Sequence, residues 1–503
     1  MKKFAAGIVS ASVLLFALVS KPGFAMDTLG PSPSAAPDGA LMAVWTQITG
    51  TNTKSELTGF ARMIVAGTGG QPTCDQFSIK TSNATLPSVF TARTNVAPTY
   101  FPVTVCEAEM YASWEEAILL ENGSGVTLWS PVASVKGAVA SFPTLHSVGR
   151  KNAGTVNMVS MGDSGCRDKG SQACDTPASW PFAELADAAI KNVPDFILHV
   201  GDYRYSHKKE NDFWEYWYEE FFYPAQDLLL AAPWVLVRGN HEACGYEDTD
   251  GLPSPWGTGW FYFLEHTASA KSTNCLSGNP SQHEPWYFDV GVQTPAGATD
   301  DHRFIVMDSS TVDVTRRQTD DFLKMLQLSD DTKSVWWAGH RPIWGLEVNL
   351  EESLMNALAQ YGGTSTCWVS AGLPCSLKTM IGGHIHNLER LQFFGAGVNA
   401  KKWLRPQQYV NGNSGVELSP ALNSSPCNFT ISQSSPSVSG PSLVATVDWV
   451  RQFGYTLWQR STKELSGWKE TRYFFDGTGV NKVAPTQLDG RQSYITCQLK
   501  LGN

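Results

Sequence analysis

Two histidines, His384 and His386, stand two residues apart directly after the apolar pair Met380-Ile381 and two glycines. In extended backbone successive side chains point to opposite faces, so both imidazoles leave the same side of the chain. Imidazole is a common metal ligand, but a spaced pair also fits the half-buried edge of a strand. Taken alone, the pair favours the strand edge over a metal site.

Four further polar clusters follow strand-like apolar runs, and each contains side chains with oxygen or nitrogen donors. The clusters are Gly162-Asp163-Ser164-Gly165, Gly201-Asp202-Tyr203-Arg204-Tyr205, Gly239-Asn240-His241-Glu242 and Gly339-His340-Arg341-Pro342. Each cluster alone has an ordinary structural explanation as a turn, a helix cap or a packed polar residue. Open α/β sheets, however, place their binding sites at the carboxyl ends of strands. Together, the five clusters predict one shared site.

The candidate ligands of these clusters combine carboxylate, amide, phenol and imidazole groups. They are Asp163, Asp202, Tyr205, Asn240, His340, His384 and His386. Such a mixture of donors suits a hard to borderline metal cation. Seven donors exceed what one ion needs, so the set predicts two ions that share a bridging carboxylate.

This set of motifs resembles the calcineurin-like metallophosphoesterases, and specifically the purple acid phosphatases. The resemblance runs from about Val156 to Val416. Tyr205, three residues after Asp202, marks the purple acid phosphatase subgroup. The stretch 337–344, which reads WAGHRPIW, also looks like the fourth motif of the tartrate-resistant acid phosphatases. Overall the chain resembles exported bacterial metallophosphoesterases that carry an N-terminal β-domain.

The resemblance implies a role for each ligand. The first metal ion, ferric iron in that family, would be held by Asp163, Tyr205 and His386. The second, a divalent iron, zinc or manganese ion, would be held by Asn240, His340 and His384, with Asp202 bridging both. The implied reaction is hydrolysis of phosphomonoesters by a metal-bound hydroxide, with both ions neutralising the phosphoryl oxygens. His241 would face the phosphate and stabilise or protonate it.

One departure from the family concerns the histidines that follow its fourth motif and protonate the leaving group. Residues 342–349 contain no histidine, and Glu347, Asn349 or His207 are the candidate substitutes. Arg204 and Arg341 stand beside ligands, where each could contact a second phosphate or serve as an ion-pair partner. An alternative function is therefore a phosphodiesterase or nucleotide-cleaving enzyme on the same metals. A more remote one is a non-catalytic binding module.

Alternating strand and helix patterns after Lys151 indicate an α/β layered core. Strands are expected at 156–161, 196–200, 234–237, 303–307, 335–338 and 377–381, and helices near 182–190, 212–230, 322–326 and 350–358. Residues 239–301 look like an irregular insertion, and residues 409–499 like further strands and loops. With the resemblance, the expected class is a four-layer α/β/β/α metallophosphoesterase sandwich with a small N-terminal β-sandwich-like domain.

The expected domain organisation begins with a signal peptide at residues 1–25, in which two lysines precede an apolar run and a small-residue cleavage site. A loose segment follows at 26–40, then an N-terminal β-domain at 41–150 with one possible helix near 112–120, and the catalytic domain at 151–503. The apolar run is too short to favour a permanent membrane span. We therefore expect an exported protein, periplasmic or secreted.

Ten cysteines lie after the expected cleavage site, and export makes an even set typical of disulfides. Pairing between sequence neighbours is the interpretation we adopt, and the chain has no C-x-x-C pair that would favour a thiolate metal site. Without its leader the chain has 34 basic and 47 acidic residues, a formal charge of −13. This balance disfavours nucleic-acid polymers, because such binding depends on basic side chains. The expected partner is a small phosphate ester, and the oligomeric state stays open.

Overall fold

The computed structural model describes most of the chain after the expected leader. The described residues are 33–81, 88–129, 140–145, 148, 155–168, 172–205, 212–244, 256–267, 275, 283–293, 299–311, 316–329, 333–344, 350–361, 366–368, 373–395, 405–419, 430–432, 443–460, 467–483 and 494–502. The expected leader, and the expected domain boundary between residues 150 and 151, both lie outside these ranges.

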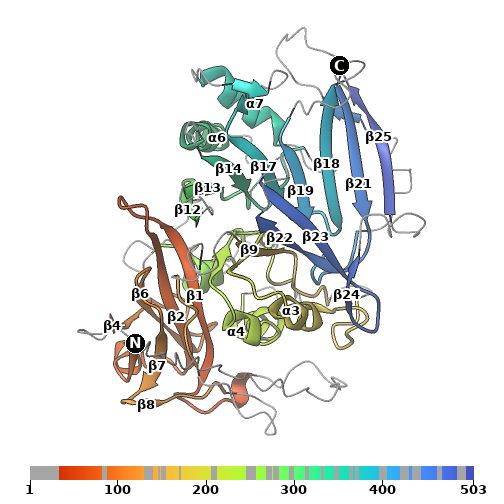
Figure 1. Cartoon of the computed structure of the whole chain (residues 1–503). Coiled ribbons are helices and arrows are strands. Elements are labelled where there is room, and N and C mark those ends of the chain that lie inside the picture. The colour runs from red at the N-terminus through yellow and green to blue at the C-terminus, as the bar shows by residue number, and fades with distance from the viewer. Residues whose placement is uncertain are drawn as a thin grey trace, which may run out of the picture.

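Two large mixed sheets form the centre of the molecule (Figure 1). The first contains, in spatial order, β24 (Val480–Val483), β23 (Trp468–Phe475), β22 (Gly454–Arg460), β9 (Asn157–Met161), β10 (Phe196–His199), β11 (Trp234–Leu236), β1 (Leu41–Thr51), β2 (Leu57–Ala66), β6 (Val103–Tyr111) and β5 (Thr91–Ala92). The second contains β12 (Trp286–Gln293), β13 (Thr299–Val306), β14 (Ser334–Ala338), β17 (Leu377–Gly382), β19 (Gln407–Asn411), β18 (Leu388–Gly395), β21 (Leu443–Val450), β25 (Tyr494–Gly502) and β20 (Thr430–Ser432).

Helices and two small sheets complete the described part. The helices are η1 (Pro33–Ala35), α1 (Gln71–Cys74), α3 (Phe182–Ile190), α4 (Trp214–Trp217), η2 (Tyr218–Phe222), α5 (Gln226–Leu229), η3 (Asn240–Glu242), η4 (Trp260–Leu264), α6 (Arg316–Leu328) and α7 (Glu351–Gln360). The small sheets are β4 (Ser88–Val89), β3 (Phe77–Thr81), β7 (Ala117–Glu121) with β8 (Ser124–Gly125), and β15 (Thr366–Trp368) with β16 (Leu373–Pro374).

The side-chain alternation of the strands explains how the layers form. In β14, Trp336 packs into the core shared by both sheets, whereas its neighbour Trp337 packs outward against the side of α6 and α7. In β10, Phe196 likewise faces the shared core while Ile197 faces the core that contains α3. Figure 1 shows α3 and α4 beside the first sheet and α6 and α7 beside the second. The predicted four-layer α/β/β/α class is confirmed.

The N-terminal strands continue the first sheet. β1 pairs in parallel with β11 where Gln47 lies opposite Trp234, so β1, β2, β6 and β5 extend the sheet that carries β9 to β11. The β4-β3-β7-β8 sheet packs through Phe77, Ile79 and Leu119 against the same hydrophobic cluster as Val44 of β1. One continuous core therefore joins the N-terminal strands to the rest of the molecule.

Three expected elements differ in the structure. The possible helix near 112–120 is wrong, because 117–121 is β7, which pairs with β3. The long helix expected at 212–230 is interrupted, since α4 passes into the π-helix η2 and a turn at Pro224 precedes α5. The expected irregular insertion contains β12, which forms the edge of the second sheet. Its pairing with β13, rather than any local pattern, makes it a strand.

Three described disulfides join sequence neighbours: Cys74–Cys106, Cys166–Cys174 and Cys244–Cys275. Cys375 is also disulfide-bonded. These pairs follow the predicted nearest-neighbour pattern, while Cys427 lies outside the described residues. Among the described helices, none combines the length and apolar character needed to cross a bilayer.

Candidate metal centre

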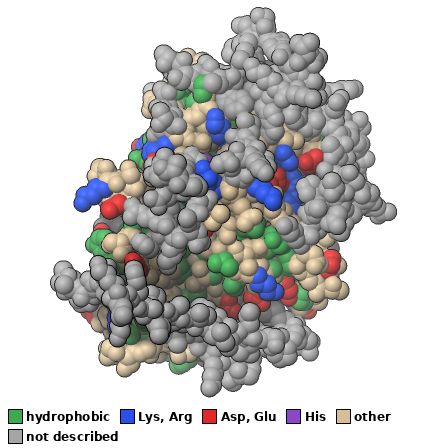
Figure 2. All heavy atoms as spheres, in the orientation of Figure 1, with side chains coloured by type: hydrophobic (Ala, Val, Ile, Leu, Met, Phe, Trp, Pro, Cys, Tyr) green, Lys and Arg blue, Asp and Glu red, His purple; other side chains and the backbone are tan. Residues whose placement is uncertain are grey.

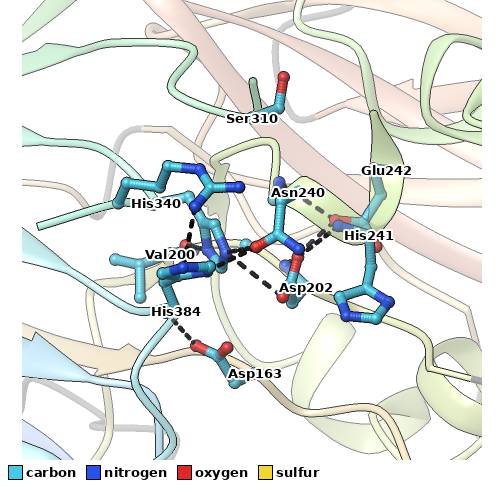
Figure 3. A network of polar contacts seen from close by, with 12 residues as sticks. Asp163, Val200, Asp202, Asn240, His241, Glu242, Ser310, His340 and His384 are labelled. Atoms are coloured by element: carbon cyan, nitrogen blue, oxygen red, sulfur yellow. Dashed lines mark hydrogen bonds and ion pairs between the residues drawn. The ribbon is translucent and has the colours of Figure 1, made fainter. Parts of the chain in front are cut away.

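The candidate ligands lie in loops that leave the carboxyl ends of five strands. In the first sheet, β9, β10 and β11 run parallel, and in the second β14 and β17 do. Asp163 follows β9, Asp202 and Tyr205 follow β10, Asn240 follows β11, His340 follows β14, and His384 and His386 follow β17. The structure thus brings together, from both sheets, all seven residues that the sequence singled out. Figure 3 shows Asp163, Asp202, Asn240, His340 and His384 in one network.

The first donor group consists of Asp163, Tyr205 and His386. The Tyr205 hydroxyl lies 2.8 Å from Asp163 Oδ1 and 3.3 Å from His386 Nε2. His386 Nε2 lies 3.6 Å from Asp163 Oδ1. Asp163 and Tyr205 are fully buried, so these donors meet in an environment shielded from water.

The second donor group consists of Asn240, His340 and His384. Asn240 Oδ1 lies 2.8 Å from His340 Nε2 and 2.6 Å from His384 Nδ1. Asp202 connects the two groups, because its Oδ2 lies 2.8 Å from the Tyr205 hydroxyl and 3.3 Å from His340 Nε2. Ligand atoms of Asp202, His340 and His384 all lie within 4.8 Å of one another. This is the position that a shared ligand requires.

Backbone carbonyls orient two of the imidazoles. His340 Nδ1 lies 2.8 Å from the carbonyl oxygen of Val200, and His386 Nδ1 lies 3.1 Å from that of Glu417. A carbonyl oxygen only accepts, so each Nδ1 carries a proton and each Nε2 of a neutral ring offers its lone pair to the site. Metal-bound histidines usually donate their second N–H in this way.

The protons available in the centre do not satisfy all of its hydrogen-bond acceptors. The Tyr205 hydroxyl has one proton for two carboxylates at 2.8 Å. Burial together with the Asp202 charge raises the pKa of Asp163 to about 7 against the effect of His340. Burial opposes the charged form of His340, yet the adjacent Asp202 raises the pKa of that imidazole to about 9. A cation among these groups would neutralise the carboxylates directly, so the donor set fits metal ions.

Backbone strain is concentrated at the same residues. Asp163, Asp202 and His384 have φ values of 54°, 56° and 70°, and they are three of the six described non-glycine residues with positive φ. Such conformations cost about 1–3 kcal/mol each and persist where the surroundings enforce them, typically at functional sites. The left-handed backbone at these residues directs their side chains toward the centre immediately after the strands end.

Glycines in the motifs allow close approach to the ligands. A Cβ on Gly239 would lie 2.0 Å from Asp202 Oδ1, and one on Gly383 would lie 2.4 Å from Asp163 Oδ2. Any other residue at these positions would displace a carboxylate. The glycines of Gly-Asn-His and Gly-His-x-His therefore make room for the ligands of neighbouring loops.

His241, the candidate catalytic residue, lies beside the centre. Its backbone N–H donates to Asp202 Oδ1 at 2.9 Å, and its ring centroid lies 4.1 Å from that of Tyr205. The indole N–H of Trp256 donates to its carbonyl oxygen at 2.9 Å. Figure 3 shows the His241 ring to one side of Asp202, separate from the pair of histidines around Asn240.

Two buried glutamates support the ligand loops, and the sequence analysis did not single them out. Glu242 accepts N–H bonds from Asp202, Tyr203 and Gly239, and burial together with the Asp202 charge raises its pKa to about 8. Glu220 accepts the N–H groups of Cys166 and Tyr205. Glu242 directly follows His241 in its motif, which is the signal that could have identified it; Glu220 carries no such local signal.

The residues proposed for substrate contact have varied surroundings. Arg204 is buried, pairs with Asp212 at 3.1 Å and stacks 4.0 Å over Trp256, so the structure shows the ion-pair alternative for it. Arg341 donates to His384 Nε2 at 2.9 Å, at the outer side of a candidate ligand. His207 and Glu347 lie outside the described residues.

Arg167 is a further cation near the centre that sequence reasoning missed. Its guanidinium carbon lies 5.6 Å from the ring centroid of Tyr205. Burial and the Arg167 charge lower the pKa of His386 to about 4. The neighbouring Cys166–Cys174 disulfide closes the loop that carries it. Its position four residues after Asp163 offers no signal, because the loop fold decides where the side chain lies.

The histidine at the end of β10, His199, is structural. His199 is buried, with Nε2 at 2.9 Å from the Ser164 hydroxyl and Nδ1 accepting the Gly201 N–H. The aromatic side chains of α4 and η2, among them Trp214, Trp217 and Phe221, pack in the buried cluster beside the first sheet.

Comparison with known proteins shows which families and folds the chain resembles. Residues 176–388 match the family model of the calcineurin-like phosphoesterases, a range that contains every candidate ligand except Asp163. No curated protein matches the chain.

Among solved structures, a purple acid phosphatase from yellow lupin (Lupinus luteus) seeds is similar at a TM-score of 0.51 and 15% identity, over 93% of this chain and 75% of that one. A structure described as PhoD matches at a TM-score of 0.42 and 11% identity, over 91% and 93% of the chains. A dimetal phosphatase from Danio rerio matches at 0.31 and 12%, over 65% and 98%. At these identities the likeness concerns the fold. Over residues 176–388 the chain thus matches the calcineurin-like phosphoesterases, a match that supports a metal-dependent phosphoric ester hydrolase, and its fold is similar to that of a purple acid phosphatase.

Proposed function

We propose that this protein is an exported phosphatase with a binuclear metal centre that hydrolyses phosphomonoesters. The observation that carries the proposal is the position of Asp202 between two complete donor groups, one of which contains Tyr205. In line with the resemblance to the purple acid phosphatases, ferric iron is assigned to the group of Asp163, Tyr205 and His386, which contains the phenol. A divalent iron, zinc or manganese ion is assigned to Asn240, His340 and His384.

When bound, the two ions supply water activation and neutralisation of the phosphoryl oxygens. The chain supplies the orientation of the ligands and a dry environment. Asp202 holds both halves at a fixed separation, and the carbonyls of Val200 and Glu417 keep two imidazoles turned inward. His241, beside Tyr205, is assigned to the phosphate, where it stabilises or protonates an oxygen.

Export is supported by the leader-like first 25 residues and by the disulfides. Disulfides persist in the periplasm and outside the cell and are rare in reducing compartments. A small phosphate ester is the substrate class we propose, because the excess of acidic residues disfavours a nucleic-acid polymer. On the face drawn in Figure 2, Lys and Arg side chains lie at several separate positions, with acidic side chains also present. A nucleic-acid-binding surface would present a continuous basic stripe.

A second candidate function is a phosphodiesterase or nucleotide-cleaving enzyme on the same centre. The favouring observation is that residues 342–349 lack a histidine for the leaving group. Arg341, which contacts His384, is a cation that a larger anionic substrate could reach. A binding module without catalysis is the remote alternative.

The deciding experiment compares 4-nitrophenyl phosphate with bis(4-nitrophenyl) phosphate on one metal-loaded preparation. We expect the monoester to be hydrolysed with the higher kcat/KM. Preference for the diester would replace the monoesterase by the phosphodiesterase, and absence of hydrolysis of either ester by fully metal-loaded protein would favour the binding module.

A further inference from the structure

We propose that the N-terminal strands position His241 through a connecting segment, residues 256–267, with Trp256 as the positioning residue. The inference rests on the proposed function only in giving His241 a catalytic task. It assigns a role to the N-terminal β-strands, which otherwise supply no ligand to the centre. The path runs from β2 and β6 through the connecting segment to the His241 backbone.

The inner end of the connecting segment lies against the loop of His241. The indole N–H of Trp256 donates to the His241 carbonyl oxygen at 2.9 Å, and Trp256 is fully buried. Gly257 follows with φ +85°, and a Cβ there would lie 2.8 Å from the Glu242 carbonyl oxygen. The segment therefore contacts His241 and Glu242, the two residues that follow Asn240.

A buried ion pair holds this inner end in place. The guanidinium carbon of Arg204 lies 4.0 Å over the Trp256 ring, and Arg204 pairs with Asp212 at 3.1 Å. Asp212 also accepts the Gly259 N–H at 2.8 Å. A desolvated cation over an indole face is attracted by the negative face of the ring. Because Arg204 directly precedes Tyr205, the same ion pair connects Trp256 to a candidate ligand loop.

The outer end of the segment is η4. Side chains from the N-terminal part of the chain donate hydrogen bonds to its backbone carbonyls. The last carbonyls of a short helix have no partner within it, and cationic side chains satisfy them well. Arg93 donates to the Phe261 carbonyl at 2.7 Å, Arg62 to that of Phe263 at 3.3 Å, and Gln47 to that of Leu264 at 2.5 Å.

The arginines that make these bonds are themselves buried and paired. Arg62 and Arg93 share Glu107 of β6, at 3.1 and 2.6 Å. Tyr262 adds a direct link, since its hydroxyl donates to the Val103 carbonyl at 2.8 Å and accepts the Val105 N–H. The segment is thus hydrogen-bonded to β1, β2 and β6 and to Arg93, which follows β5.

This arrangement predicts a specific effect on catalysis. Trp256 donates to the backbone carbonyl of His241, so its loss should change how His241 meets the phosphate while metal binding persists. The test variant is Trp256→Phe, which keeps an aromatic ring under Arg204 but removes the N–H. The matched control is Trp260→Phe in the same segment, because the indole nitrogen of buried Trp260 has no hydrogen-bond partner among the described residues.

We expect Trp256→Phe to lower kcat about five- to tenfold, with KM and metal content unchanged, as for loss of one hydrogen bond that acts in the transition state. In a His241→Ala background, Trp256→Phe should have no further effect on kcat. Tyr262→Phe should show a smaller decrease with the same dependence on His241.

A readout that does not require activity is amide hydrogen exchange of the peptide that contains residues 240–243. Trp256→Phe should accelerate this exchange and Trp260→Phe should leave it unchanged. Equal exchange in both variants, or additive losses of kcat with His241→Ala, would overturn the positioning role. If exchange responds as expected but the wild-type protein hydrolyses no ester, the positioning role stands and the proposed function fails.

Discussion

At the scale of residues, Asp202 is the candidate ligand whose carboxylate contacts both donor groups of the centre. Asp202 contacts Tyr205 and His340 through one carboxylate oxygen and the His241 N–H through the other. The remaining ligands belong to one half each. A change at Asp202 should therefore affect both metal ions, whereas a change at Tyr205 should affect the electronic properties of one.

Asp202→Asn should lose metal and activity together. We expect kcat/KM to fall by more than about 100-fold, the upper range for losing even an outer partner of a metal ligand. Metal analysis and kinetics on the same preparation provide the measurement. Asp289→Asn is a control, because Asp289 is a buried carboxylate that pairs with Arg303. Full metal content with normal activity in Asp202→Asn would refute the bridging role.

Tyr205→Phe should abolish a visible charge-transfer band, because in the proposed centre this band arises from the Tyr205 phenolate bound to ferric iron. Without metal, burial and the neighbouring carboxylates raise the pKa of Tyr205 well above its ordinary value, so ionisation needs the cation. The adjacent Tyr203→Phe is the matched control, since the Tyr203 hydroxyl donates to the Val237 carbonyl instead. Active wild-type protein that is colourless and free of iron contradicts the ferric assignment.

At the scale of elements, the strand ends determine where ligands project. Each motif glycine lies where a neighbouring loop approaches, and three ligands adopt left-handed backbone. The buried Glu242 then fixes the loops after β10 and β11 to each other through the N–H groups of Asp202 and Gly239. The geometry of the centre thus depends on loop backbones as much as on ligand identity.

Gly239→Ala tests this dependence. The added methyl group would lie 2.0 Å from Asp202 Oδ1 and 2.2 Å from its backbone nitrogen, so Asp202 must shift. We expect kcat/KM to fall about 100-fold, as for a displacement near 1 Å, and the free energy of unfolding to fall by about 1–3 kcal/mol. Gly125→Ala, where a Cβ meets no atom within 4 Å, should change neither quantity. Kinetics and denaturant unfolding measure both, and a fully active Gly239→Ala enzyme would rule out the close packing.

At the scale of the whole molecule, two sheets and one continuous core hold the centre between them. β1 joins the N-terminal strands to β11, and the connecting segment 256–267 joins them to His241. The two donor groups lie at the junction of both sheets, so metal ions bound there would connect the sheets. Metal binding should therefore contribute to the stability of the entire fold.

The stabilisation by metal should grow as pH rises. In the metal-free protein, burial raises the pKa of Asp163 to about 7 from 3.8, so between these values the folded chain holds a proton that the unfolded chain has released. The metal-free fold therefore loses stability as pH increases, whereas metal ions bind the deprotonated ligands. We expect the difference in Tm between metal-loaded and chelator-treated protein to increase from about pH 5 to pH 8. A constant or shrinking difference in thermal melts contradicts this linkage.

Much of the centre could be predicted from sequence because its signals are local. The type of a donor, the apolar run before it and the glycine beside it are all read within a few residues, as for Gly382-Gly383-His384. The same locality identified α3 and the strand before Asp163. The break at Pro224 was also local, and the long-helix interpretation overlooked it.

Contacts between distant segments were decided only by the tertiary structure. β12 became a strand by pairing with β13, and Arg204 became part of an ion pair because Asp212 and Trp256 fold against it. Sequence patterns record which face of an element is apolar, but not which distant segment will cover that face. The sequence by itself therefore determined the donors and their strand ends. Folding decided that Asp202 lies between two donor groups and that Trp256 reaches His241, because both depend on packing between segments far apart in the chain.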